Sequence, residues 1–231
     1  MKNSFYRGSK SSRLKFFLFL TAFIIASLFT ESTQAVDISS SDLIGFRGGF
    51  WRVDKARNLP DTIQAKTYTP YLELFISHGI KKGFSLELDL GAGYRGDTKF
   101  ISGGTYYFEN WNLYPVSGKI RYSLFSIYPQ RRFQPYLDLG LTFLTASSTY
   151  DNPYYVDIVY VSTKTAFGAL AGWGVDFSLS PRILFNLDFQ YRWVSFGQNV
   201  AGVKNYSGPQ LTFGLGYVIK QKRSKIGEGV F

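Results

Sequence analysis

Eight segments of about ten residues alternate apolar and polar side chains, and this pattern restricts the possible folds more than any other feature of the sequence. In FSLELDLGAGYRG (84–96), Phe84, Leu86 and Leu88 fall on one parity, and Glu87 and Asp89 fall on the other. Because successive side chains of a β-strand point to opposite faces, each segment is predicted to be a strand with one apolar and one polar face. The eight segments are 43–53, 71–78, 84–96, 114–124, 135–144, 167–178, 183–193 and 210–219.

The connections between these segments alternate in length. Short links at 78–83, 125–132 and 179–182 alternate with long ones at 54–67, 95–112, 146–163 and 195–208. Short turns at one end and long loops at the other are typical of an up-and-down meander closed into a barrel. No segment beyond residue 35 follows the helical period, so the predicted fold class is all-β, an eight-stranded antiparallel up-and-down β-barrel.

The first 35 residues are expected to be removed from the mature protein. Residues 1–15 carry five bases and no acid, 16–30 form an apolar run, and 31–35 end in the small residue Ala35. This order is the pattern of a secretory signal peptide; an uncleaved helical anchor is the alternative, although a spanning helix needs about 20 apolar residues. We therefore expect a signal peptide at 1–35, a barrel at 36–219 and a basic C-terminal tail at 220–231.

Charge and cysteine content restrict the classes of partner and of stabilisation. The formal net charge of +10 falls to +6 when the five bases and one acid of residues 1–35 are removed. An excess of this size, dispersed along the chain, does not predict a nucleic-acid partner. The chain has no cysteine, so an exported form must be stable without disulfides. Beyond residue 35 no apolar run reaches helix-spanning length, so membrane insertion would have to use strands.

Alternation alone does not tell which face is outside. A soluble periplasmic lipocalin-like binder would enclose a ligand with its apolar face, whereas a membrane barrel turns that face to lipid. The polar face favours the membrane form, because it combines glycine with six acids and four bases, as expected for a narrow interior filled by paired charges. These ten side chains form the predicted lumen network: Arg47, Glu73, Glu87, Asp89, Lys119, Arg121, Asp138, Asp176, Asp188 and Arg192.

Aromatic residues near the strand ends favour the same orientation. Two aromatic belts are typical of the two membrane interfaces, although aromatic residues also suit β-strands in general. The expected outer belt is Phe50, Tyr94, Tyr106, Tyr107, Trp111, Tyr114, Tyr191, Trp193 and Tyr206, and the expected inner belt is Phe84, Tyr122, Phe177 and Tyr217. The sequence therefore predicts a transmembrane β-barrel, with the lipocalin-like binder as the alternative.

Three stretches resemble the closing strands of the bacterial outer-membrane β-barrel domain family: PYLDLGLTFL (135–144), FGALAGWGVDFSLSPRILFNLDFQYRW (167–193) and LTFGLGYVI (211–219). This family groups small eight-stranded barrels similar to the OmpA transmembrane domain and to opacity-type porin-family proteins, and the resemblance covers most of 40–219. It implies an assembly signal in the last strand, for which Thr212, Gly214, Tyr217 and Ile219 match the spacing. The outer-membrane assembly machinery would be its partner. The basic tail at 220–231 departs from the family pattern.

The expected function is non-catalytic. His78 is the only histidine, and Ser77 beside it would point to the opposite face of a strand, so neither a hydrolase-like pair nor a metal or cofactor site is predicted. We expect a monomer in the outer membrane of a Gram-negative-type bacterium, in contact with outer-membrane lipid. Its expected role is envelope structure or surface interaction through long loops, with an unidentified extracellular or periplasmic partner. An OmpW-like passive channel for small hydrophobic molecules is the alternative, which the charged inward residues disfavour.

Overall fold

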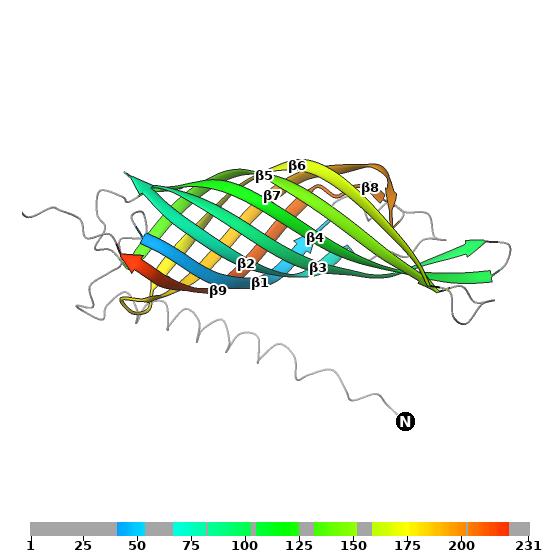
Figure 1. Cartoon of the computed structure of the whole chain (residues 1–231), viewed down its shortest axis with the longest axis horizontal. Helices are drawn as coiled ribbons and strands as arrows, with labels where there is room; N and C mark the ends of the chain where they lie inside the picture. Colours follow the sequence, from blue (N-terminus) through cyan, green and yellow to red (C-terminus); the bar gives the residue numbers. More distant parts are fainter. Residues whose placement is uncertain are drawn as a thin grey trace, which may run out of the picture. The chain divides into compact units, whose positions relative to one another are not determined.

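The computed structural model describes residues 41–53, 67–81, 83–102, 105–124, 132–151, 159–201 and 203–221 (Figure 1). The predicted signal peptide at 1–35 and all but the first two residues of the predicted tail lie outside the described residues. Every described strand lies in one compact unit, Ala35–Phe231, which is separate from the unit Met1–Gln34. In the described part of the chain, no helix is long and apolar enough to cross a membrane.

Nine antiparallel strands account for nearly all described residues. They are β1 (Ser41–Arg52), β2 (Tyr68–Lys81), β3 (Phe84–Ser102), β4 (Thr105–Ser123), β5 (Phe133–Asp151), β6 (Val159–Ser178), β7 (Ile183–Val200), β8 (Val203–Asn205) and β9 (Gly208–Gln221). The sheet runs in the order β6-β5-β4-β3-β2-β1-β9-β7, and the additional β6–β7 pairing closes it. The strands β1 to β7 and β9 therefore form the predicted eight-stranded up-and-down barrel, and the short β8 pairs only with β7.

The links between the barrel strands are divided between the two ends of the barrel. Ser41 at the start of β1 is in register with Gln221 at the end of β9, so the first and last strands begin and end on one side. The links β2–β3, β4–β5 and β6–β7 lie on that side, which we call the short-turn end. We call the opposite side the long-loop end (Figure 1).

The apolar face of every barrel strand is on the outside. On β3, Phe84, Leu86, Leu88 and Leu90 are exposed over 44–49% of their surface, whereas Glu87 on the same strand is 2% exposed. A continuous apolar exterior around a closed barrel is the surface that lipid covers in a membrane barrel. The fold thus has the orientation predicted for a transmembrane barrel and not that of a lipocalin-like binder.

The strands are longer than the sequence pattern predicts. Segments 95–112 and 146–163 were expected to be loops, but β3 pairs with β4 up to Ser102 and Thr105, and β5 pairs with β6 up to Asp151 and Val159. A tilted strand crosses a bilayer in about 9–11 residues, so strands of 19 and 20 residues extend beyond it. Outside the membrane the outer face no longer meets lipid, and the alternation that reveals a strand is lost.

Two members of the expected outer aromatic belt are inside the barrel instead. Trp111 is 2% exposed and Tyr206 is fully buried, because both lie on inward-facing positions of their segments. The side chains of Tyr106 and Tyr107 lie outside the described part of the structure. The other expected belt residues are exposed or half-buried on the outer wall.

Candidate functional site: the filled barrel interior

The interior of the barrel is divided along its axis into three layers. On β1, three inward side chains four residues apart mark them in turn: Leu43 near the short-turn end, Arg47 in the middle and Trp51 toward the long-loop end. Leu43 belongs to a lower apolar layer with Phe75, Leu184 and Val218. Trp51 belongs to an upper apolar layer, and the charged side chains between them form what we call the ion-pair layer.

Arg47 is the central cation of the ion-pair layer. Its Nη1 lies 2.9 Å from Glu73 Oε1 on β2, and its Nη2 lies 2.6 Å from Glu87 Oε1 on β3. Nη1 is also 3.2 Å from Asp188 Oδ2 on β7. The guanidinium stacks 4.0 Å above the ring of Phe75, which places it directly on the lower apolar layer. One side chain thus links four strands across the interior.

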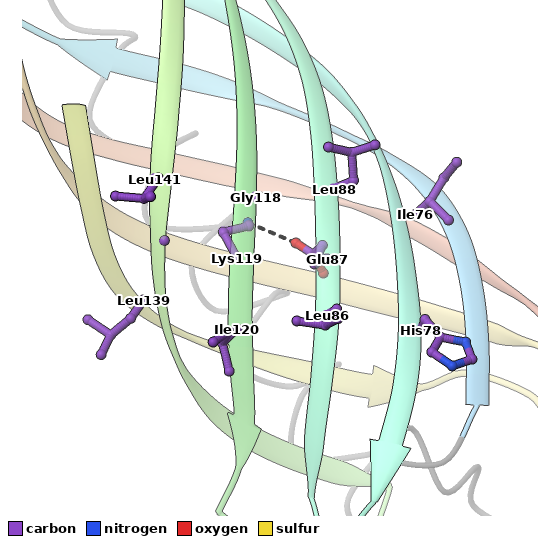
Figure 2. A pocket seen from close by; sticks show the side chains of 11 residues that line it. Ile76, His78, Leu86, Glu87, Leu88, Gly118, Lys119, Ile120, Leu139 and Leu141 are labelled. Carbon is purple, nitrogen blue, oxygen red and sulfur yellow. Dashed lines mark ion pairs between the residues drawn. The ribbon is translucent and has the colours of Figure 1, made fainter. Parts of the chain in front are cut away.

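Lys119 and Arg121 on β4 extend this network to the far wall. Lys119 Nζ lies 2.8 Å from Glu87 Oε1, the pair drawn in Figure 2, and 2.7 Å from Asp89 Oδ2. Arg121 Nη2 lies 2.9 Å from Glu87 Oε2, and its Nη1 is 3.5 Å from Asp176 Oδ2 on β6. Glu87 therefore binds three cations at once.

All ten side chains of the predicted lumen network lie inside the barrel and are at most 4% exposed. Nine of them take part in ion pairs, including Asp138 on β5, whose Oδ2 is 3.9 Å from Lys119 Nζ. Arg192 contacts neutral partners instead: its Nη1 donates to Thr142 Oγ1 at 2.8 Å and its Nη2 to Gln210 Oε1 at 2.9 Å. Its guanidinium lies 5.1 Å from the ring of Trp51, so Arg192 borders the upper apolar layer.

Neutral residues that sequence reasoning missed complete the ion-pair layer. The ring of Tyr136 lies 3.7 Å below the guanidinium of Arg121, and its hydroxyl accepts a hydrogen bond of 2.9 Å from Asn186. Gln190 donates to Asp188 at 2.9 Å. These residues share the inward parity of the charged ones, and that parity is the signal that could have identified them.

Inward glycines make room for two of the buried tyrosines of the interior. A Cβ atom at Gly91 would collide with the phenol of Tyr71 on the neighbouring strand, and one at Gly174 would collide with the phenol of Tyr136. Both tyrosines are at most 2% exposed. These glycines thus leave space for the phenol rings of the neighbouring strands.

The upper apolar layer closes the interior toward the long-loop end. It contains Trp51, Val53, Trp111, Leu113, Leu144, Ala146, Ala166, Val194, Phe196, Val200, Ala201, Val203 and Tyr206. The segment 200–206, which includes β8, folds back onto this layer: the Tyr206 hydroxyl donates to the Val200 carbonyl at 2.8 Å, and the Tyr206 ring lies 6.3 Å from that of Trp51. Much of the layer comes from positions that were expected to be loop, which is why sequence reasoning missed it.

The remaining predicted positions are on the wall. In the expected assembly signal, Thr212 points inward, and Gly214 lies opposite Arg47 in the register of β9 and β1. Tyr217 and Ile219 are exposed on the outside. Their role in assembly stays a prediction. His78 faces outward near the short-turn end, with Nδ1 2.7 Å from Asp42 Oδ1, and Ser77 is buried on the inner face. Among the described residues, no three His, Cys, Asp or Glu side chains are grouped to hold a metal ion.

The chain is similar to several solved structures of outer membrane proteins. Among solved structures, OprG from Pseudomonas aeruginosa is 18% identical with a TM-score of 0.55, covering 81% of this chain and 99% of OprG. A major outer membrane protein from Thermus thermophilus is 13% identical with a TM-score of 0.47, and the match covers 78% of this chain and 100% of that protein. Outer membrane protein W of E. coli is 16% identical with a TM-score of 0.45, and the match covers 78% of this chain and 98% of that protein.

No curated protein matches the sequence significantly. The model of the outer membrane protein beta-barrel domain matches residues 26–218, which is most of the chain. With its closed eight-stranded barrel and apolar exterior, the chain belongs to the outer membrane protein beta-barrel domain family.

Proposed function

We propose that this protein is a non-catalytic integral component of the outer membrane of a Gram-negative-type bacterium, exported by its signal peptide and closed to solutes along its axis. It would serve envelope structure, surface interaction, or both. The observation that carries the proposal is the ion-pair layer, in which seven of the eight barrel strands contribute at least one buried charged side chain to the interior.

The energetics of the ion-pair layer support a permanent seal. A solute moving along the axis would have to separate Arg47, Lys119 and Arg121 from carboxylates at 2.6–2.9 Å. Removing one partner from a buried ion pair costs about 3–5 kcal/mol, because the other charge is left without compensation. Eight-stranded barrels have interiors just wide enough for side chains to fill. The apolar layers on either side add a second barrier to ions and polar solutes.

The projecting strands support a surface role. β3 pairs with β4 up to Ser102 and Thr105, and β5 pairs with β6 up to Asp151 and Val159, so these strands are longer than the roughly 9–11 residues that cross a bilayer. A paired extension of this kind is stiffer than a loop and holds its side chains at a defined distance from the membrane. Outer-membrane lipid and the outer-membrane assembly machinery are the partners this proposal requires, and the protein would act as a monomer.

Two measurements test the proposal. Fractionation of the producing cell should place the protein in the outer membrane with heat-modifiable gel mobility, and recovery from the soluble periplasm would contradict it. In a liposome swelling assay, vesicles containing the refolded protein should swell no faster in small sugars than empty vesicles. Swelling that rises with the amount of protein would contradict a sealed interior.

The upper apolar layer favours a second candidate, a passive channel for small hydrophobic molecules. A small apolar molecule entering from the long-loop end would meet Trp51, Trp111 and Leu144 before reaching the ion-pair layer. Naphthalene is a suitable probe, because binding there should change the fluorescence of the two buried tryptophans in a saturable way. We expect no saturable change, and a change abolished by W51F together with W111F would favour the channel.

A further inference from the structure

One part of the lipid-facing wall is hollow. The hollow has a volume of about 580 Å³ and crosses β2, β3, β4 and β5 (Figure 2). Two rows of side chains border it, and in each row the residues are in register on neighbouring strands. The first row is Ile76, Leu88, Gly118 and Leu141, and the second is His78, Leu86, Ile120 and Leu139. We call the space between these rows the Gly118 trough.

Gly118 is what opens the trough. It stands between Leu88 and Leu141 in the first row, and a Cβ atom added there would have no neighbour within 4 Å. Gly48 is also on the outer wall, but a Cβ atom there would lie 3.0 Å from Leu72, which already fills its space. Position 118 is therefore open where the position of Gly48 is filled; Gly197 on β7 is open as well, but it does not line the hollow.

The trough is polar at one end and apolar at the other. His78 lies three residues before the end of β2 at the short-turn end, whereas Leu141 lies eight residues after the start of β5. The trough therefore rises from the membrane interface into the hydrocarbon layer. Beside its lower margin the rings of Phe84 and Tyr122 lie 4.8 Å apart, as expected for an interfacial aromatic pair. Four strands at a spacing of about 4.8 Å give it a length of roughly 14 Å.

The polar end is formed by His78, which contacts Asp42 on β1 beside the lining residues. His78 and Asp42 have side chains 59% and 28% exposed, and the contact between them uses Nδ1 and Oδ1. This leaves Nε2 of the ring and the second carboxylate oxygen for a ligand. A protonated imidazole donates from both nitrogens, so Nε2 suits a phosphate oxygen, and the carboxylate suits an ammonium group.

We propose that the Gly118 trough is a binding site for one phospholipid of the membrane leaflet at the short-turn end. One acyl chain lies between the two rows of side chains, and a zwitterionic phosphoethanolamine headgroup lies on the Asp42–His78 pair. The shape supports the acyl chain, because the empty position at Gly118 lets the chain sink below the surrounding leucines. Charge complementarity supports the headgroup, because phosphate and ammonium match the imidazole and the carboxylate.

Native mass spectrometry of the detergent-purified barrel, incubated with phosphatidylethanolamine or phosphatidylglycerol, tests the proposal. The wild-type protein should retain one phosphatidylethanolamine and less phosphatidylglycerol. Gly118→Leu fills the trough and should reduce retention about tenfold, which corresponds to roughly two methylene groups left unburied. Ala169→Leu is the matched control, since it adds apolar volume to an exposed wall position on β6 outside the trough, and it should leave retention unchanged.

Each alternative occupant gives a different result. Equal retention by wild type and Gly118→Leu, or equal loss in Ala169→Leu, would overturn the site. A dimer that dissociates on Gly118→Leu would show that a second copy of the chain fills the trough instead. Equal retention of both lipids, or a preference for phosphatidylethanolamine that survives His78→Ala, would overturn the headgroup assignment. If Gly118→Leu loses heat-modifiable mobility, Gly118→Ala replaces it, with an expected loss of retention in the same direction.

Discussion

Arg47 on β1 and Glu87 on β3 meet 2.6 Å apart at the centre of the barrel, with both side chains fully buried. β2 separates the two strands in the sheet, so this contact spans the interior and does not run along the wall. Since Glu87 also binds Lys119 and Arg121, the pair joins the separate contacts of the ion-pair layer into one network.

Removing the central cation should destabilise the barrel strongly. Arg47→Met leaves Glu73, Glu87 and Asp188 without their shared partner, and we expect a loss of about 3–5 kcal/mol in the free energy of unfolding. Urea unfolding of the refolded protein in lipid vesicles measures it. Arg182→Met, which removes an exposed arginine from the β6–β7 turn, is the control and should lie within about 0.5 kcal/mol of wild type. Similar losses in the two variants would contradict the account.

A charge on the lipid-facing side of a strand should impair insertion more than a lost charge on its inner side. Leu88→Arg places a cation on the outer wall, where such a change costs about 2–4 kcal/mol at mid-membrane depth. Asp89→Asn, at the next position, keeps the side-chain shape and removes one charge from the ion-pair layer. Its partner Lys119 keeps Glu87 at 2.8 Å, so no buried cation loses its last carboxylate. The folded fraction, measured by heat-modifiable gel mobility, should be lower for Leu88→Arg. The reverse order would show that β3 faces the other way.

The period-two alternation predicted the strands, because lipid on one side and a filled interior on the other act on every membrane-spanning residue. The alternating lengths of the links predicted a closed barrel, and the charged, glycine-containing polar face predicted which side lies inside. The ten charged inward residues followed from the same parity. The upper apolar layer could not be predicted this way. Its members, such as Trp111 and Tyr206, lie where the outer face has left the lipid and alternation gives no signal. The Gly118 trough was equally hidden, since it depends on the sizes of side chains on four strands.

Gly91 and Tyr71 should be energetically coupled. Gly91→Ala brings a methyl group into the phenol of Tyr71, and overpacking of this kind costs about 1–3 kcal/mol. In a Tyr71→Leu background the ring is gone and the same substitution should cost much less. A double-mutant cycle on the free energy of unfolding measures the coupling. Additive effects would show that the ring lies elsewhere.

The segment that follows β7 should be held in place by its buried tyrosine. Tyr206→Ala removes the ring that packs on Trp51 and Phe196 and the hydrogen bond to Val200. Limited proteolysis should then cleave within 197–206 faster than in wild type, because the loss of a buried aromatic ring costs about 3–5 kcal/mol. Lys204→Ala, which truncates an exposed side chain in β8, is the control and should leave the cleavage rate unchanged. Equal rates in wild type and Tyr206→Ala would contradict the packing described here.

The central claim is that the ion-pair layer seals the barrel, and single-channel recording in planar bilayers tests it most directly. The wild-type protein should show no steady conductance. Tyr206→Ala should show none either, because it loosens the upper apolar layer and leaves the charged contacts of Arg47, Lys119 and Arg121 intact. A steady open conductance from the wild-type protein would contradict the sealed interior and the function proposed from it.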